Sequence, residues 1–413
     1  LLASQQYIRG GGRYDQVGAI DDAFVTHTSD NVYQVHGHRN AQNYPAQYNQ
    51  RCFNLEGKVE FGGTLRVAQL AEEGWSVVEI SNQSAEGILH PENAPLIHSL
   101  RTNKLISERS LPGNISSFHF KPKVFYDKKW TAQTVRARGL FMNTLTNEIV
   151  IRAYDKFFNI GERRETEFAA LKDQLVFPVR AWVKENGYLG LVGYDATLGD
   201  LVFASKTTTE SDFAGWFRRL FLQRYGKHVD AIRQYLAEHN VCLVCEVILP
   251  AEDPHIIEYV QDRIVLLDIV RRQEKFAAVD QVERERFAAM FGIETKRLAA
   301  TLQTWDEFAT WYEQVQGLDY LYDGVPIEGF VIEDAQHWQV KAKLDYYSFW
   351  KRMRGVLDGL KAGRRPKRAA AYPHPEYAAR VITYMQSIPT DTLAQMSIID
   401  VRRRWQREQE KAV

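Results

Sequence analysis

The chain has 413 residues, 45% hydrophobic and 12% aromatic, which is enough for more than one domain with a core of its own. Its 52 basic and 52 acidic side chains leave no formal net charge, so binding of a polyanion would require local basic surfaces. Three cysteines exclude a disulfide framework, and no stretch approaches the roughly 20 apolar residues that span a bilayer. We therefore expect a cytoplasmic protein without a membrane partner and, because the chain begins with Leu1, a portion of a longer polypeptide.

The N-terminal part, residues 1–112, reads as a small β-rich unit followed by a connector. Turn residues separate three short strand-like runs at 32–35, 58–61 and 64–67. The stretch from Ser81 to Gly113 is rich in Asn, Pro, Ser and Gly and only weakly periodic, which predicts an irregular connector.

The central part, residues 113–344, predicts an α+β domain with antiparallel sheets. Strand-like runs recur at 139–142, 148–153, 188–192, 201–204, 242–249, 264–267 and 329–332. Helical patterns interrupt them at Ser211–Tyr225, Asp280–Phe291 and Trp305–Val315, the first with a serine at the N-cap position. This order favours antiparallel sheets over repeated strand-helix-strand units.

The C-terminal part, residues 345–413, predicts a helical domain with a basic surface. Residues 341–368 carry ten positive charges against two negative ones, with four aromatic residues interleaved. Such a segment is either a solvated helix face with core aromatics or a nucleic-acid contact, in which cations neutralise phosphates and aromatic rings stack on bases.

Two cysteines, Cys242 and Cys245, are three residues apart within an apolar run. Their spacing resembles a redox pair, but residues three apart on a strand face opposite sides of the sheet. We therefore expect two separate core thiols.

The strongest chemical signal is Lys184-Glu-Asn-Gly187, between the apolar run 176–183 and the strand that begins at Tyr188. A tight hairpin there would project the Lys184 amine from a fixed position. The amine attacks phosphorus only when it is neutral, so nearby cations, a metal ion or burial must lower its pKa. A surface lysine beside an ordinary Asn-Gly turn is the alternative.

Candidate partners for this lysine occur along the chain, although each also has a purely structural interpretation. Cationic groups suit a triphosphate, and carboxylates suit a metal ion or a ribose. Lys341 and Lys343 alternate on one predicted strand, so both ammonium groups would point from the same face as a phosphate clamp. The other candidates are Arg138, Lys156, Glu246 and Glu328.

The order of these motifs resembles the covalent nucleotidyltransferases, specifically RNA ligases similar to the T-even phage RNA ligase and the fungal tRNA ligase adenylyltransferase domain. The resemblance covers roughly residues 118–350. It rests on Arg138-Gly-Leu-Phe141, Lys156-Phe-Phe-Asn-Ile-Gly-Glu162, Lys184-Glu-Asn-Gly187, Cys245-Glu-Val247, the run 253–259, Glu328-Gly-Phe-Val331 and Val340-Lys-Ala-Lys343.

The resemblance implies a ligase-type nucleotidyltransferase fold, unrelated to ATP-grasp, that carries AMP on Lys184 and passes it to RNA. The implied cofactors are ATP and Mg²⁺ or Mn²⁺, and the implied partner is RNA with 5′-phosphate and 3′-hydroxyl ends. Catalytic roles fall on Lys184, Lys341 and Lys343. Nucleotide-binding roles fall on Arg138, Lys156, Phe158, Asn186, Gly187, Glu246, Glu328 and Gly329, with Glu246 and Glu328 also as metal ligands. Asn186 stands where many such ligases have Asp, and the helical tail resembles the appended RNA-recognition domains of RNA ligases.

A second resemblance concerns the N-terminal unit. Val35-His-Gly-His-Arg-Asn40 and the run 52–67 resemble the last metal-ligand loop and closing strands of a metallophosphoesterase. Such domains accompany kinase and ligase modules in bacterial RNA-repair polypeptides, so kinase and phosphatase domains of the same polypeptide are implied partners. His36 and His38 would be vestigial metal ligands or ordinary loop histidines, and we expect no phosphatase activity because earlier metal motifs are absent.

Two alternatives to an RNA ligase stay open from the sequence. One is an RNA-binding module with an inactive nucleotidyltransferase fold. The other is a GTP-dependent nucleotidyltransferase of the capping type.

Overall fold

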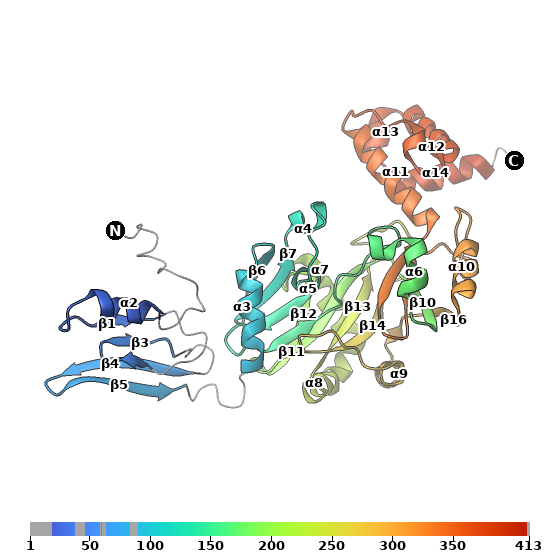
Figure 1. Ribbon diagram of the computed structural model, residues 1–413. Helices are drawn as coiled ribbons and strands as arrows, with labels where there is room; N and C mark the ends of the chain where they lie inside the picture. The colour runs from blue at the N-terminus through green and yellow to red at the C-terminus, as the bar shows by residue number, and fades with distance from the viewer. Residues whose placement is uncertain (1–18, 38–45, 58, 60–62, 83–89, 411–413) are drawn as a thin grey trace.

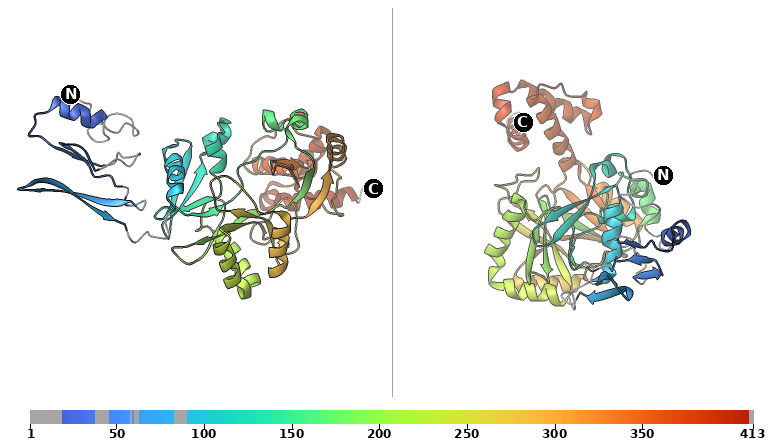
Figure 2. Two further views of the ribbon diagram at one scale, coloured as in Figure 1. Left: turned by 60° about the horizontal axis from the view of Figure 1, so that its bottom comes forward. Right: turned by 90° about the vertical axis from the view of Figure 1, so that its left-hand side faces the viewer.

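The computed structural model describes residues 19–37, 46–57, 59, 63–82 and 90–410. Figure 1 shows a small N-terminal unit in blue, a central body in cyan to orange, and a C-terminal group of helices in red. The two views in Figure 2 show the same three parts. The central body mixes helices with largely antiparallel sheets, which confirms the predicted α+β class with a β-rich N-terminal unit and a helical C-terminal part.

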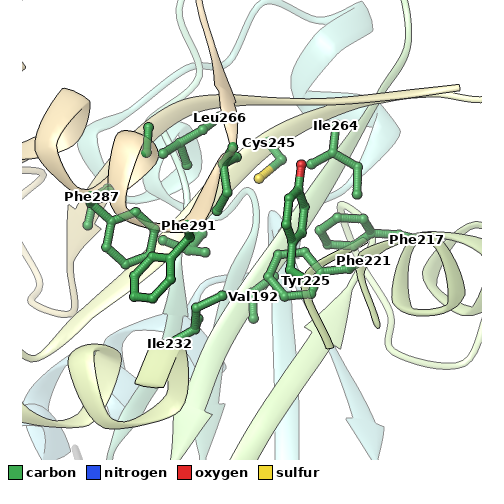
Figure 3. Close-up of a cluster of buried hydrophobic side chains, with 14 of the residues drawn as sticks. Val192, Phe217, Phe221, Tyr225, Ile232, Cys245, Ile264, Leu266, Phe287 and Phe291 are labelled. Carbon is green, nitrogen blue, oxygen red and sulfur yellow. The ribbon is translucent and has the colours of Figure 1, made fainter. Parts of the chain in front are cut away.

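A five-stranded sheet forms the middle of the central body. Its order is β12 (Asp200–Ala204), β11 (Tyr188–Asp195), β13 (Val241–Ile248), β14 (Arg263–Arg271) and β15 (Glu294–Thr295). One face is covered by α7 (Asp212–Tyr225), α8 (Val229–Glu238) and α9 (Gln281–Phe291). Figure 3 shows part of the resulting core, to which α7 contributes Phe217, Phe221 and Tyr225, β13 contributes Cys245 and α9 contributes Phe287.

The opposite face of this sheet packs against a second, four-stranded sheet. Its order is β6 (Ile106–Leu111), β7 (Ile115–Phe120), β8 (Leu140–Asn143) and β9 (Ile149–Arg152). Cys242 is buried in this second interface, whereas Cys245 is buried beneath the helices. The prediction of two separate core thiols is therefore confirmed.

Part of the expected connector is folded into the central body. Residues 94–111 form α3 (Ala94–Thr102) and β6, and residues 91–93 form a short 3₁₀ turn. Leu96, Ile97 and Leu100 of α3 are buried against β6, β7 and β8. The connector prediction was wrong here because a nine-residue helix has too few apolar positions for its period to stand out among polar residues. A boundary at residue 112 would separate β6 from its partner β7.

The third sheet carries the Lys184 motif. Its order is β16 (Leu298–Leu302), β10 (Val179–Lys184), β17 (Gly329–Glu333) and β18 (Gln339–Lys343). One face packs against α6 (Phe168–Gln174) and α10 (Trp305–Gln314). The predicted hairpin after Lys184 was wrong, because β10 pairs with β16 and β17 whereas β11 pairs with β12 and β13. Residues 185–187 instead cross from one sheet to another.

The predicted N-cap at Ser211 is confirmed, and the structure adds caps at both ends of α9. The Ser211 hydroxyl caps α7 by accepting from the Ala214 amide, and Asp280 caps α9 through the Glu283 amide. Gly292 ends α9 in the left-handed conformation that favours glycine. Two short helices, α4 (Pro122–Tyr126) and α5 (Ala132–Arg136), lie between β7 and β8.

The C-terminal helices form a separate core. They are α11 (Asp345–Lys361), α12 (Pro375–Ser387), α13 (Thr390–Gln395) and α14 (Ile398–Glu410). Phe349, Trp350 and Met353 of α11 pack against α12 and α14, so these aromatic residues serve the core. Within the described residues, no helix is long and apolar enough to cross a membrane.

The N-terminal unit holds α2 (Ala19–His27), a three-stranded sheet and a two-stranded hairpin. The sheet has the order β1 (Gln34–His36), β3 (Cys52–Asn54) and β2 (Gln47–Asn49). The hairpin pairs β4 (Thr64–Ala71) with β5 (Gly74–Ser81). The strand expected at 58–61 lies almost wholly outside the described residues.

The contact between the first two sheets requires a glycine at position 193. A Cβ atom there would lie 2.1 Å from the Val150 carbonyl oxygen and 2.5 Å from Ile151 Cγ1. We expect Gly193→Ala to lower the free energy of unfolding by about 1–3 kcal/mol, because the sheets must separate. Urea denaturation measures this change. Gly215→Ala in α7 is the matched control, since a Cβ there meets nothing within 4 Å and raises helix propensity. Equal effects of the two substitutions would contradict the close-contact argument.

Candidate active site

A cavity of about 450 Å³ lies between the third sheet and the five-stranded sheet. This volume is in the range of sites that bind small molecules. Its wall on one side comes from β10, β17 and β18, and on the other from β11 and β13. The predicted residues that line it are Arg138, Lys184, Asn186, Gly187, Glu246, Glu328, Lys341 and Lys343.

Strand alternation places the three lysines in this cavity. On β18, Val340 and Ala342 enter the core beneath α6 and α10, so Lys341 and Lys343 point from the other face. On β10, Val183 enters the same core and Lys184 points into the cavity. The structure confirms the prediction that Lys341 and Lys343 point from the same face of their strand.

Glycines allow the strands to come close at the point where the cations meet. Lys184 is level with Gly329, and Gly329 is level with Lys343 on the next strand. A Cβ atom on Gly329 would lie 2.2 Å from the Ala342 carbonyl oxygen, and its φ of +153° is one that other residues rarely adopt. On the far side, a Cβ on Gly187 would lie 2.1 Å from the Val247 carbonyl oxygen.

The Glu328 carboxylate is the hub of the site. It accepts ion pairs from Lys184 Nζ at 3.0 Å and from Lys343 Nζ at 2.8 Å. The Asn186 side-chain amide donates to the same carboxylate at 2.9 Å. Glu328 is 3% exposed, so water screens these contacts little. The two lysines lower the pKa of Glu328 although its burial acts in the opposite direction.

The environment of Lys184 differs from the expectation in one respect. Burial, one of the three expected causes, does act to lower the pKa of Lys184, but the carboxylates of Glu328 and Glu246 outweigh burial and raise it. The amine is therefore an ammonium ion in the ligand-free protein. The nearest charges are anionic, which the order of residues along the chain does not reveal.

Glu246 lies across the cavity from the third sheet. Its Oε1 accepts from the Gly187 backbone amide at 2.9 Å, which fixes the end of the Lys184 motif to β13. Burial, and then the charge of Glu328, raise the pKa of the Glu246 carboxyl against the opposing effect of Lys184. A buried carboxyl at a cavity wall suits a hydroxyl or a cation.

Lys341 has the opposite environment to Lys184. Its Nζ donates to the Phe157 carbonyl oxygen at 3.1 Å and lies 4.2 Å from the centre of the Phe157 ring. Burial, reinforced by Arg138 and three lysines, lowers the pKa of Lys341 to about 6. This side of the cavity therefore carries several cationic groups, and no ion pair of Lys341 is found among the described residues, which suits a polyanion.

Two predicted nucleotide-binding residues lie beside the cavity rather than on its wall. Lys156 and Phe158 line an adjacent hollow of about 310 Å³ that shares Tyr154, Phe157 and Gln339 with the first. Lys156 Nζ lies 3.8 Å from the centre of the Phe158 ring and 3.5 Å from Glu162. After burial, the positive charges of Arg138 and Lys156 are what lower the pKa of Lys341 most.

Several lining residues carry no sequence motif that singles them out. Lys296 Nζ donates to Asp268 at 2.8 Å and lies 4.6 Å from the Trp182 ring centre, forming part of the cavity floor. Tyr154 donates to the same aspartate. Arg354 and Tyr347 reach the cavity from α11, beyond the third sheet. Their place depends on how distant segments pack, although the basic composition of 341–368 indicated the arginine.

The carboxylates offer limited room for a metal ion. Glu328 is engaged by two lysines and an amide, which makes it a counter-ion rather than a free ligand. Among the described residues, no group of three or more His, Cys, Asp or Glu side chains that could hold a metal ion occurs. Glu246 is the carboxylate that fits Mg²⁺, which proteins bind through one or two carboxylates together with substrate phosphates.

Of the two predicted vestigial metal ligands, the structure describes His36. His36 Nε2 lies 2.9 Å from Asp21 Oδ1, a structural contact between β1 and α2. His38 lies outside the described residues.

The low pKa of Lys341 predicts that the protein takes up a proton when it binds a polyanion. Since the pKa of Lys341 is about 6, the side chain is largely neutral at pH 7.5 and gains a proton when a polyanion occupies the cavity. We expect inorganic triphosphate binding at pH 7.5 to take up at most about one proton through this residue. Calorimetry in buffers of different ionisation enthalpy measures the uptake. The uptake should vanish in Lys341→Met, and an unchanged value in that variant would contradict the assignment.

Lys341 also contributes to the pH dependence of stability. A pKa near 6 in the folded state, below the ordinary lysine value of 10.5, means that the unfolded chain binds more protons between these values. The free energy of unfolding should therefore fall as pH decreases from about 10 to 6 and show less of this dependence in Lys341→Met. Urea titrations across this range measure the slope.

The sequence matches the RNA ligase family over residues 136–347, just over half of the chain. A tRNA ligase from Candida albicans is 31% identical over 166 residues, covering 33% of this chain and only 19% of that protein. An archaeal ATP-dependent RNA ligase is 14% identical, with 77% of this chain and 75% of that chain covered and a TM-score of 0.44. A putative ATP-dependent DNA ligase from Aquifex aeolicus is also 14% identical, with 70% of each chain covered and a TM-score of 0.42. The family match includes every cavity-lining residue predicted from the sequence, and we conclude that this chain belongs to the RNA ligase family.

Proposed function

We propose that this chain is an ATP-dependent RNA ligase that joins 5′-phosphate and 3′-hydroxyl ends through AMP bound to Lys184. The observation that carries the proposal is the convergence of Lys184, Lys341 and Lys343 on one cavity with Glu328 between two of them. A nucleophile and cations for phosphates then occupy one site.

The reaction has three steps in this proposal. The neutral Lys184 amine attacks the α-phosphorus of ATP, forming a P–N bond while the bond to pyrophosphate breaks. An oxygen of the RNA 5′-phosphate then attacks the same phosphorus, and the P–N bond breaks to release the lysine. Finally the 3′-hydroxyl attacks the 5′-phosphorus, forming the phosphodiester and releasing AMP.

The side chains around Lys184 support roles in the first step. Lys184 begins as an ammonium ion beside Glu328, so it must lose a proton before attack. Lys341 and Lys343 flank the α-phosphate and balance its charge, while Arg138 and Lys156 hold the outer phosphates. Mg²⁺ or Mn²⁺, held by Glu246 and the phosphates, would supply charge that neutralises the leaving pyrophosphate and favours the neutral amine.

We also propose that α11 contacts the RNA. Arg354 lines the cavity, and Lys351 Nζ lies 5.7 Å from the ring centre of Tyr347, another lining residue. These two cations extend the charge of β18 onto the C-terminal helices. A single strand entering the cavity would meet them first with its phosphates.

The proposed cellular role is RNA repair, with tRNA as one substrate class and ends prepared by kinase and phosphatase domains of the same polypeptide. The N-terminal resemblance to a metallophosphoesterase and the tRNA ligase relative support this context.

Covalent labelling tests the first step. The protein is mixed with a divalent metal ion and ATP labelled in its α-phosphate, and the label is followed on a denaturing gel. We expect an acid-labile adduct, as a phosphoramidate should give, that is absent in Lys184→Met because the nucleophile is lost. The exposed Lys172→Met in α6 is the matched control and should label normally.

The same assay separates the alternatives. Labelling by GTP in place of ATP would favour the capping type. Absence of an adduct with either nucleotide, together with retained RNA binding, would favour the inactive RNA-binding module and contradict the proposal.

A second prediction concerns Lys351. Binding of 5′-phosphorylated RNA to the protein is measured at several salt concentrations. Lys351→Ala should weaken RNA binding and reduce the slope of log K against log salt by about 0.7, the value for one phosphate contact on a single strand. The exposed Lys227→Ala, between α7 and α8, should leave both unchanged. Equal salt slopes in all three proteins would contradict an α11 contact.

A further inference from the structure

A loop in the central body touches both the Lys184 motif and the C-terminal helices. Residues 249–262 connect β13 to β14 without forming a helix or strand of their own. A loop of this length depends on contacts for its shape. Ile256 and Ile257 are 2% and 3% exposed because they enter the hydrophobic core of the C-terminal helices.

Arg402 of α14 holds this loop from the C-terminal side. Its guanidinium donates to the Ile256 carbonyl oxygen at 2.6 Å and to Glu258 Oε2 at 2.5 Å. Arg402 is 2% exposed and lies within 6 Å of the ring centres of Tyr346 and Trp350. A buried fork with one bond to backbone and one to a carboxylate fixes position more strongly than a surface ion pair.

The other side of the loop holds Asn186. The Ile257 amide donates to Asn186 Oδ1 at 3.1 Å. The Tyr259 hydroxyl accepts from the Asn186 backbone amide at 2.7 Å and donates to Glu185 at 2.9 Å. Tyr259 does not line the cavity among the described residues, so it acts on Asn186 from behind.

Asn186 in turn reaches the reacting group. Its side-chain amide donates to Glu328 Oε2, the oxygen that Lys184 Nζ contacts at 3.0 Å. The order of contacts is therefore Arg402, the loop at 256–259, Asn186, Glu328 and Lys184. Every member lies within hydrogen-bonding distance of the next, and most are buried.

We propose that Arg402 is a positioning residue for nucleotide transfer, holding the β13–β14 loop so that Asn186 orients Glu328 and the Lys184 amine. The inference rests on the proposed function, because it concerns the rate at which Lys184 receives AMP. It makes the C-terminal helices part of the first chemical step as well as a surface for RNA. Arg402 touches no reacting atom and acts only through the loop.

The experiment compares Arg402→Lys and Arg402→Met in the full chain with Arg404→Met on the same helix. Arg404 is about half exposed and pairs with Glu408, so its loss removes a guanidinium without touching the loop. Adduct formation from labelled ATP is measured in single turnover over a range of ATP concentrations, and thermal unfolding is followed in parallel. We expect the maximal rate to fall about 10- to 100-fold in both Arg402 variants, as for small displacements of reacting groups. The ATP concentration at half-maximal rate should change little, and Arg404→Met should behave like the parent.

Tyr259→Phe provides an independent arm that leaves the C-terminal core in place. It removes the two hydrogen bonds to Asn186 and Glu185, so it should lower the maximal rate in the same way. Combined with Arg402→Lys, its effect should be clearly less than the product of the single effects, because both changes release the same loop. A purely structural role for Arg402 would lower the unfolding temperature without this coupling.

The outcomes separate the two proposals. If the parent protein forms no adduct, the proposed function itself fails. If the parent forms the adduct and folded Arg402→Lys and Arg402→Met react at the parent rate, the positioning role is overturned. If the Arg402 variants do not fold, Tyr259→Phe decides, and a parental rate in that variant overturns the role as well.

Discussion

The arrangement of this molecule around its cavity depends on one carboxylate shared between two lysines. Glu328 is nearly fully buried, and it pairs with Lys184 from β10 and Lys343 from β18. Burying either ammonium group alone would be costly, so the carboxylate is what permits a cavity with so many cations. The same contact sets the protonation of Lys184, which stays charged until the surroundings change. The pair therefore holds the Lys184 amine in place as an ammonium ion in the ligand-free protein.

The two lysines of β18 differ in protonation because their surroundings differ. Lys343 is balanced by Glu328, whereas Lys341 has a carbonyl oxygen and an aromatic ring as its nearest partners and a depressed pKa. They are two residues apart on one face of one strand, yet one is a stable ion pair and the other is poised to gain a proton. A site with both properties can receive a polyanion without having to break every ion pair first.

The close approach of the sheets gives the site its geometry. Gly329 and Gly187 let backbones meet where any side chain would collide, and this brings Lys184 within reach of Glu328 and fixes Gly187 to Glu246. The loop at 256–259 adds a third support that reaches from α14 to Asn186. The C-terminal helices are therefore in contact with the site through both α11 and this loop.

The sequence by itself determined the features that arise from near neighbours. The helix cap at Ser211 follows from the local sequence. The opposite faces of Cys242 and Cys245 and the shared face of Lys341 and Lys343 follow from the two-residue period of a strand. The order of motifs also indicated the family. Only the tertiary structure decided that residues 185–187 join two sheets rather than a hairpin, that α3 and β6 belong to the central body, and that carboxylates raise the pKa of Lys184. Strand partners and the balance of charge around a buried group depend on segments distant in the chain, and local periodicity carries no information about which of them meet.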